Sequence, residues 1–216
     1  MIRFLIRNLL FLTYLLFFTL SAYAGEWPVV CLDPGHGGSS TGAKSSDGLL
    51  EKDFTLQMAN DLSELLIRKA PVKTLLTRSV DGDVSLQARR DFASQNQCSV
   101  FVSLHANASP QKNQRGTEIY YSKDQEIESR KLARKVYDQL NLSLKREYPD
   151  SRGRGVKAGD FFVLRSVTIP SVLVEFSFLD NPIEGQRMKG SHYRKRLLEG
   201  VAAGLIDYLH HFYDSP

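Results

Sequence analysis

Short apolar runs alternate with amphipathic stretches along most of this 216-residue chain, and this alternation restricts the possible folds more than any other feature. Apolar runs at residues 28–33, 72–77 and 99–104 have the length and composition of buried strands. Between them, residues 54–70 and residues 85–95 are expected to form helices, the first because its apolar side chains recur at helical spacing. A β-α-β-α-β order predicts a largely parallel sheet covered on both faces.

The second half of the chain continues this pattern. We expect strands at residues 116–121, 161–164 and 171–176, and a long helix whose apolar stripe runs over residues 127–144. The clearest stripe, over residues 193–212, marks a final helix. The sequence therefore predicts an α/β fold: a single domain with a mostly parallel, twisted sheet of about six strands and helices on both faces.

The N-terminus has the pattern of a secretory signal peptide. Two arginines precede an apolar run at residues 9–20, and the small-x-small triplet Ala22-Tyr23-Ala24 follows it. A membrane anchor is the alternative, but the apolar run is shorter than the ~20 residues that a spanning helix needs. We expect cleavage after Ala24, so that residues 1–24 are removed and residues 25–216 form one exported domain, periplasmic or secreted.

Charge and cysteine content narrow the possible environments and partners. Removing the signal peptide takes away Arg3 and Arg7, so the net charge falls from +4 to +2, with both signs scattered along the chain. This balance suits an anionic cell-envelope surface and gives no support to a nucleic-acid partner. The only cysteines are Cys31 and Cys98. Their strands place them at similar heights but not necessarily side by side, so we expect two buried free thiols, with a disulfide as the alternative.

Four residues that can bind metal or move protons are expected at one edge of the sheet. His36 lies in a glycine-rich loop directly after the first strand, His105 follows the strand at residues 99–104, and Glu175 closes the run at residues 171–176. The carboxyl ends of parallel strands meet at one edge, and the helix that Glu51 opens begins at the same edge. Two histidines and a carboxylate form a sound catalytic zinc set that leaves the fourth position for water.

Each of these residues also has a structural interpretation. A histidine after a strand is often only hydrogen-bonded, and Glu51 can be a first-turn carboxylate favoured by the helix dipole. Glu175, in contrast, would carry a desolvation cost within an apolar strand unless a partner or a task offset it. The remaining histidines lie on or just before the last helix and are expected at the surface: His192, His210 and His211.

Seven segments carry a family resemblance through their order and spacing. They are LDPGHGG at residues 32–38, Glu51 at a helix start, LTR at 76–78, SLHAN at 103–107, RGVK at 154–157, VLR at 163–165 and VLVE at 172–175. From Val29 to about Tyr208 the chain resembles the zinc-dependent N-acetylmuramoyl-L-alanine amidases of the cell-division and spore-lysis type. The pattern departs at Ser177, where such amidases usually have Gly or Ala, and at Ser99, where many have Asp.

The resemblance implies a role for each candidate residue. His36, Glu51 and His105 would bind one zinc ion, with iron or manganese as alternatives, and Glu175 would be the catalytic glutamate. The implied reaction is hydrolysis of the amide bond between N-acetylmuramic acid and the L-alanine of the peptidoglycan stem, with Glu175 as general base and then general acid.

Four further residues are candidates for supporting roles. Asp33 and Asn107 are expected to orient the metal ligands, although Asp33 can equally cap a turn. Arg154 and Lys157, together with Arg152, are expected to bind the carboxylates of the stem peptide, the alternative being a solvated basic loop.

Two other functions stay open from sequence. Another exported zinc amidohydrolase or carboxypeptidase acting on wall peptides could use the same ligands. A non-catalytic peptidoglycan-binding module would lack a ligand or Glu175, and all four residues are present.

Division amidases of the family often carry an inserted helix that plugs the site. Here residues 149–160, which include the glycine- and arginine-rich segment 150–155, are too few for such a plug and are expected to be a flexible basic loop. We expect a monomer that spans no membrane after signal cleavage and requires no activator.

Overall fold

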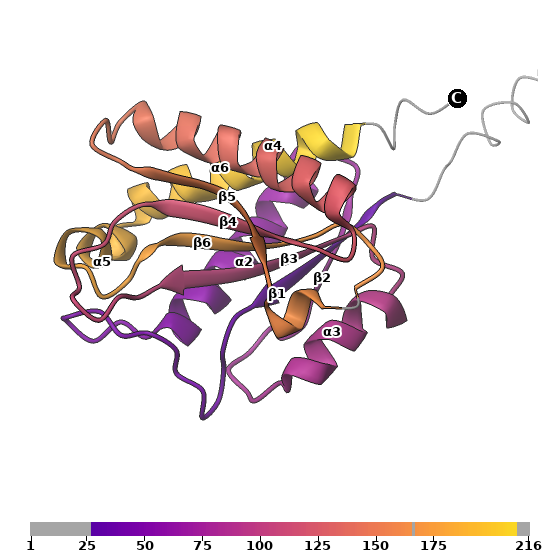
Figure 1. Ribbon diagram of the computed structural model, residues 1–216, viewed down its shortest axis with the longest axis horizontal. Helices are drawn as coiled ribbons and strands as arrows, with labels where there is room; N and C mark the ends of the chain where they lie inside the picture. The colour runs from indigo at the N-terminus through magenta and orange to yellow at the C-terminus, as the bar shows by residue number, and fades with distance from the viewer. Residues whose placement is uncertain (1–26, 166, 211–216) are drawn as a thin grey trace, which may run out of the picture.

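Six strands form one sheet in the order β2-β1-β3-β6-β4-β5 (Figure 1). The computed structural model describes residues 27–165 and 167–210, so the expected signal peptide and the residues after His210 lie outside the described part. All neighbouring strands run parallel except β4 and β6, which are antiparallel. The strands are β1 Val29–Pro34, β2 Lys73–Leu76, β3 Val100–Asn107, β4 Thr117–Ser122, β5 Gly153–Gly159 and β6 Ser171–Phe178. The expected mostly parallel α/β sheet is confirmed.

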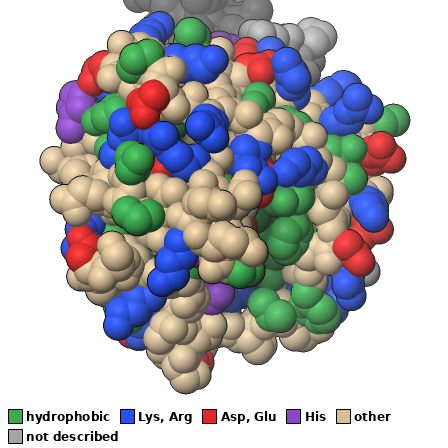
Figure 2. Space-filling view, turned by 60° about the vertical axis from the view of Figure 1, so that its left-hand side comes forward, with side chains coloured by type: hydrophobic (Ala, Val, Ile, Leu, Met, Phe, Trp, Pro, Cys, Tyr) green, Lys and Arg blue, Asp and Glu red, His purple; other side chains and the backbone are tan. Residues whose placement is uncertain are grey.

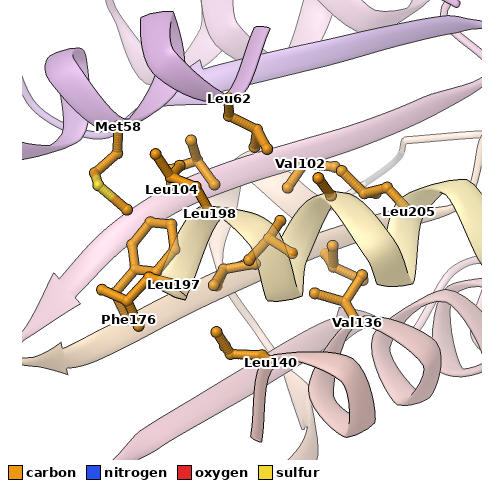
Figure 3. Packing of buried hydrophobic residues seen from close by; sticks show 14 of the residues in the cluster. Met58, Leu62, Val102, Leu104, Val136, Leu140, Phe176, Leu197, Leu198 and Leu205 are labelled. Atoms are coloured by element: carbon orange, nitrogen blue, oxygen red, sulfur yellow. The ribbon is translucent and has the colours of Figure 1, made fainter. Parts of the chain in front are cut away.

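Helices cover both faces of this sheet, as the sequence predicts. On one face lies the larger core, built with α2 Glu51–Lys69, α4 Glu126–Lys145 and α6 Ser191–Leu209. Figure 3 shows Met58 of α2, Val136 of α4 and Leu197 of α6 gathered around Val102 and Leu104 of β3. The opposite face, called the α3 face below, packs against α3 Leu86–Gln95 and the short 3₁₀ helix η1 Phe162–Leu164.

The α3 face positions the candidate site. Side chains alternate along a strand, so Phe101 and His105 of β3 share this face, as do Leu173 and Glu175 of β6. Phe101 and Leu173 belong to the small core under α3 and η1, whereas His105 and Glu175 do not. The carboxyl ends of β3 and β6 therefore carry polar side chains beyond the edge of that core.

The structure corrects two expectations about the region between α4 and β6. The prediction of a strand at residues 161–164 is wrong. Residues Phe162–Leu164 form the 3₁₀ helix η1 instead, and its buried side chains Val163 and Leu164 pack against the sheet. The segment expected to be a flexible loop instead begins β5, an edge strand that pairs only with β4 and has no run of buried residues. A further helix, α5 Pro182–Lys189, begins at Asn181, whose side chain accepts hydrogen bonds from the first backbone N–H groups.

The expectation of two free thiols is also wrong, because Cys31 and Cys98 form a disulfide. Cys98 lies in the turn between α3 and β3, where strand alternation does not yet apply. The backbone N–H of Ser99 donates to the Val29 carbonyl at 2.8 Å, which brings this turn against the start of β1. The resulting Cα–Cα distance of 5.8 Å lies within the usual range for a disulfide.

Replacing both cysteines, Cys31→Ser with Cys98→Ser, is expected to lower the free energy of unfolding by about 4 kcal/mol. The bond closes a loop across 67 residues, and releasing that loop increases the conformational entropy of the unfolded chain. Urea denaturation of the oxidised wild type and the double variant measures the difference. The wild type under reducing conditions serves as the control and should approach the variant. Equal midpoints, together with two titratable thiols in the untreated wild type, would restore the free-thiol expectation.

Candidate metal centre

Three side chains from distant parts of the chain meet at one point. His36 follows β1, Glu51 is the first residue of α2, and His105 lies near the end of β3. The Nε2 atom of His36 lies 3.1 Å from one oxygen of Glu51, and the Nδ1 atom of His105 lies 2.9 Å from the other. One ligand atom from each residue falls within 4.8 Å of the others. The sequence therefore predicted this convergence correctly.

Glu51 is fixed by backbone groups as well as by the histidines. Its Oε2 accepts a hydrogen bond from the N–H of Ala43 at 2.8 Å, and its Oε1 accepts one from the N–H of Ala106 at 3.0 Å. Burial raises the pKa of this carboxyl, but the hydrogen bonds from His105 and His36 outweigh burial and hold the pKa well below its usual range. Glu51 is therefore an ionised, oriented carboxylate and not only a first-turn residue of α2.

The loop after β1 brings the His36 ring to Glu51. A Cβ atom at Gly42, which has φ of +66°, would lie 2.4 Å from the Glu51 carboxylate and 2.7 Å from the His36 ring, so only glycine leaves room for them. Ser40 Oγ lies 3.0 Å from Nδ1 of His36, which leaves Nε2 facing Glu51. Histidine ligands of metals usually use their second ring nitrogen in such a bond. Ser40 was not among the residues selected from the sequence.

A buried ion pair between Asp33 and Arg89 holds the loop that carries His36. Asp33 is fully buried and accepts hydrogen bonds from Arg89 at 2.6 Å, Thr77 at 2.6 Å and Ser103 at 2.7 Å. Arg89 in turn donates to the carbonyl oxygens of Pro34 and His36. Asp33 thus neither touches a ligand ring nor caps a turn, because it acts on the backbone of His36 through Arg89. Arg89 has no signal in the sequence that marks this contact.

Glu175 lies beside the three ligands and differs from Glu51 in its contacts. It pairs in register with His105 on the neighbouring strand. Its Oε2 atom is shielded from solvent and has no hydrogen-bond partner among the described residues. Burial raises the pKa of Glu175 to about 7, His105 opposes this, and the charges of Glu51 and Glu118 add to it. A carboxyl with this pKa can both accept and donate a proton near neutral pH.

The three side chains have the donor atoms that zinc binds. Tetrahedral zinc binds nitrogen and oxygen at roughly 2.0–2.1 Å, which separates neighbouring ligand atoms by about 3.3 Å. The distances of 3.1 Å and 2.9 Å join the two histidines to different oxygens of Glu51, and one ligand atom from each residue lies within 4.8 Å of the others, so binding one ion would draw these atoms closer together. The orphaned Oε2 of Glu175 faces no protein donor in the described chain, as expected for a group whose partner is a substrate or water.

A groove of about 400 Å³ borders this centre on the α3 face. Figure 2 turns the left-hand side of Figure 1 forward, the side toward which the β3 arrow points, and shows Lys and Arg side chains gathered beside a hollow lined by hydrophobic groups. The groove is lined by both histidines and by residues of the loop before α3, of α3 and of η1: Asp33, Gly35, His36, Gly37, Ser40, Asp83, Val84, Ser85, Leu86, Arg89, His105 and Val163.

Three of the remaining predicted residues meet around a carboxylate that the sequence did not single out. Asn107 donates through Nδ2 to Oε1 of the buried Glu118 at 2.5 Å, so it does not contact the ligands. Arg154 donates to Oε2 of Glu118 at 3.1 Å, and Lys157 forms an ion pair with the same oxygen. The basic segment is thus not simply solvated. Glu118 lies in a strand with no glycine-rich loop or histidine nearby to mark it.

Comparison with known proteins places the chain in a family. The family model described as N-acetylmuramoyl-L-alanine amidase matches residues 30–207. The chain belongs to this amidase family. It is 33% identical to the N-acetylmuramoyl-L-alanine amidase LytC of Bacillus subtilis, over 83% of this chain and 35% of LytC. The crystal structure of an N-acetylmuramoyl-L-alanine amidase from Clostridium difficile 630 matches with a TM-score of 0.81 and 32% identity, covering 86% of this chain and 98% of that one.

The chain spans only part of the length of several relatives that it matches. This amidase-family chain spans 36% and 35% of the length of two curated relatives that it matches. It covers 99% of the CwlD amidase from Clostridioides difficile, which was solved in complex with the GerS lipoprotein, and that structure matches 85% of this chain with a TM-score of 0.77 and 29% identity. The family is metal-dependent, and His36, Glu51 and His105 form a possible metal site in the described part of the chain.

The two departures from the family pattern have local partners. Ser99 accepts a hydrogen bond from the backbone N–H of Val29 at 3.1 Å. Ser177 donates to Glu184, a buried carboxylate that also accepts from the backbone N–H of Phe178 at 3.1 Å. Neither serine contacts the three metal-site residues, so both substitutions leave the centre intact.

Proposed function

We propose that this chain hydrolyses the amide bond between N-acetylmuramic acid and L-alanine in peptidoglycan, using one zinc ion held by His36, Glu51 and His105. The observation that carries the proposal is the half-buried Glu175, with one shielded and unpartnered oxygen, beside a three-ligand group. Membership of the amidase family supports the choice of substrate. Two imidazoles and a carboxylate favour zinc over iron or manganese, although metal availability also contributes to the choice.

The residues divide the chemistry between them. Zinc, when bound, supplies a Lewis acid that polarises the scissile carbonyl and lowers the pKa of a neighbouring water toward ~7. Glu175, whose pKa burial raises to about 7, accepts the proton of the attacking water at its carboxylate. It then donates that proton to the nitrogen of the departing L-alanine, so that the amide bond breaks with an amine as leaving group. Arg89 and Ser40 hold the His36 loop and ring in place during both transfers.

The place of action follows from the family and the N-terminal pattern. Residues 1–24 act as a signal peptide, and residues 25–216 are the exported amidase domain, periplasmic or secreted. The described chain contains no helix that is both long and apolar enough to cross a membrane. Relatives named as cell wall amidases support a wall-associated role.

Purified, zinc-loaded protein comprising residues 25–216 is expected to release stem peptides that begin with L-alanine from cell-wall sacculi, with no partner added. The segment between α4 and η1 forms the edge strand β5 and offers no helix to plug the site, although the relative CwlD was solved with GerS. Mass spectrometry of the digest identifies the products, and protein treated with a metal chelator is the control. Shortened stems would indicate a carboxypeptidase, and no products at all would indicate a binding module. Products seen only after a partner is added would contradict activator independence.

A further inference from the structure

Three charged or titratable side chains form a row across adjacent strands on the α3 face. His105 of β3 pairs in register with Glu175 of β6, and Glu175 pairs with Glu118 of β4. Residues paired in this way on neighbouring strands point to the same face, with Cβ atoms about 4.5–5.5 Å apart in the antiparallel case. Glu118 is therefore the direct neighbour of the catalytic carboxylate, on the side away from the metal site.

Glu118 is buried yet fully partnered. It is 2% exposed, and its two oxygens accept hydrogen bonds from Asn107, Tyr120, Arg154 and Lys157. Burial raises the pKa of Glu118, but the bonds from Lys157 and Arg154 outweigh burial and lower it, which keeps the carboxylate charged. One negative charge against two positive charges leaves this group with a net charge of about +1.

A bulge in β5 brings both cations to Glu118. Arg154 and Lys157 are three residues apart, so a regular strand would point them to opposite faces. The register between β4 and β5 shifts here: Thr117 pairs with Gly153, while Ile119 pairs with Val156, so β5 contains one extra residue. Gly155 takes φ of +95° at this point. The bulge therefore turns both side chains toward the same carboxylate.

The two cations are held but not covered. The Arg154 guanidinium lies 5.0 Å from the centroid of the Phe178 ring, and its Nη1 donates to Gln114 at 3.0 Å. The Lys157 ammonium lies 5.7 Å from the centroid of the Tyr120 ring. Both side chains stay partly exposed, 32% for Arg154 and 41% for Lys157, so their charged ends remain open to a ligand.

We infer that Glu118 is a positioning residue that fixes Arg154 and Lys157 as a clamp for one carboxylate of the stem peptide. The inference rests on the proposed peptidoglycan amidase function. Two strand spacings, about 10 Å, and a register offset of two residues, about 7 Å along β4, place the backbones of Glu175 and Lys157 about 12 Å apart. An extended peptide rises about 3.3 Å per residue, so the clamp accepts a carboxylate within about four residues of the scissile amide.

The test compares two synthetic N-acetylmuramoyl peptides of the same sequence, one with free carboxylates and one with every carboxylate converted to a primary amide. Zinc-loaded wild type is expected to show a kcat/KM at least about tenfold higher for the free form, the effect of losing a charge-assisted hydrogen bond. The difference should lie mainly in KM, because the clamp binds substrate and transition state alike. Lys157→Met should bring the ratio of the two kcat/KM values close to one.

Variants distinguish a positioning role of Glu118 from a general structural role. Partial unfolding lowers the kcat/KM values for both peptides and leaves their ratio unchanged, whereas loss of positioning lowers the ratio. Glu118→Gln is expected to lower the ratio at least about threefold, and to have no further effect on it in the Lys157→Met background. Gly155→Ala, which strains the bulge without a steric clash, should lower the ratio as well and carries the test if Glu118→Gln does not fold. Lys131→Met on α4 removes the same charge elsewhere and should leave the ratio unchanged.

The outcomes that overturn the inference are distinct from those that overturn the proposed function. Equal rates on the two peptides by the wild type remove the clamp and keep the amidase. A variant at Glu118 or Gly155 that slows both peptides equally removes the positioning role. A lower ratio in Lys131→Met would assign the effect to overall charge and remove the clamp. Hydrolysis of neither peptide by the wild type overturns the proposed function, and the inference with it.

Discussion

Replacing Glu175 with glutamine is expected to leave the metal in place and to lower turnover by roughly 10²- to 10⁴-fold, the usual effect of removing one positioned proton-transfer group. Glutamine keeps the size of the side chain but cannot take the proton of the attacking water. The Oε2 atom of Glu175 has no hydrogen-bond partner among the described residues, so little is lost in the resting protein. Because burial raises the pKa of Glu175 to about 7, the neutral side chain suits the site, and the melting temperature should stay equal or rise.

Metal content, melting temperature and product release are measured on the same Glu175→Gln preparation. Glu184→Gln is the control, because Glu184 is a buried carboxylate outside the metal centre that accepts hydrogen bonds from the backbone N–H groups of Gly116 and Phe178. The control should lower the melting temperature while its folded fraction keeps its metal and its specific activity. Full-rate release of stem peptides by Glu175→Gln would exclude the proposed role, and loss of zinc would instead make Glu175 a ligand.

The sequence was sufficient to predict that the candidate residues meet, because the carboxyl ends of parallel strands lie at a common edge of the sheet. His36, His105 and Glu175 each follow or close an apolar run, and a parallel sheet brings such positions together. Glu51 was found for the same reason, since the helix after β1 begins at that edge. Buried strands have a strong apolar signal, so β1, β3 and β6 were predicted within a few residues of their observed bounds.

The parts that the sequence did not reveal depend on pairings between distant residues. β5 is an edge strand with a bulge and half-exposed side chains, so it has neither an apolar run nor a strict alternation. The disulfide depends on how the turn after α3 approaches β1, a tertiary contact that strand heights alone do not define. Glu118 and Arg89 act through long-range hydrogen bonds, and their neighbours in sequence give no sign of those partners.

Replacing Glu51 with glutamine is expected to lower zinc affinity by more than about 100-fold, and activity should be lost together with the metal. The same change at Glu175 is expected to leave the metal bound. Each oxygen of Glu51 accepts a backbone N–H, from Ala106 at one and from Ala43 at the other. In glutamine one oxygen becomes an NH₂ group, so a donor faces a buried donor whichever way the amide turns. The variant also loses the negative charge that balances the metal, and the unsatisfied N–H costs about 1–3 kcal/mol of stability.

Zinc titration followed by elemental analysis, with unfolding measured on the metal-free and metal-loaded protein, checks this result. His105→Ala should behave alike, because two remaining ligands cannot hold the ion. His192→Ala is the matched histidine control, since His192 lies on α6, exposed and paired with Glu147, and it should keep full zinc content and activity. The wild type should gain stability on adding zinc, whereas Glu51→Gln should not, because only binding to the folded state shifts unfolding. Glu51→Gln protein that purified with full zinc would remove Glu51 from the ligand set and leave it as the backbone anchor between the His36 loop and β3.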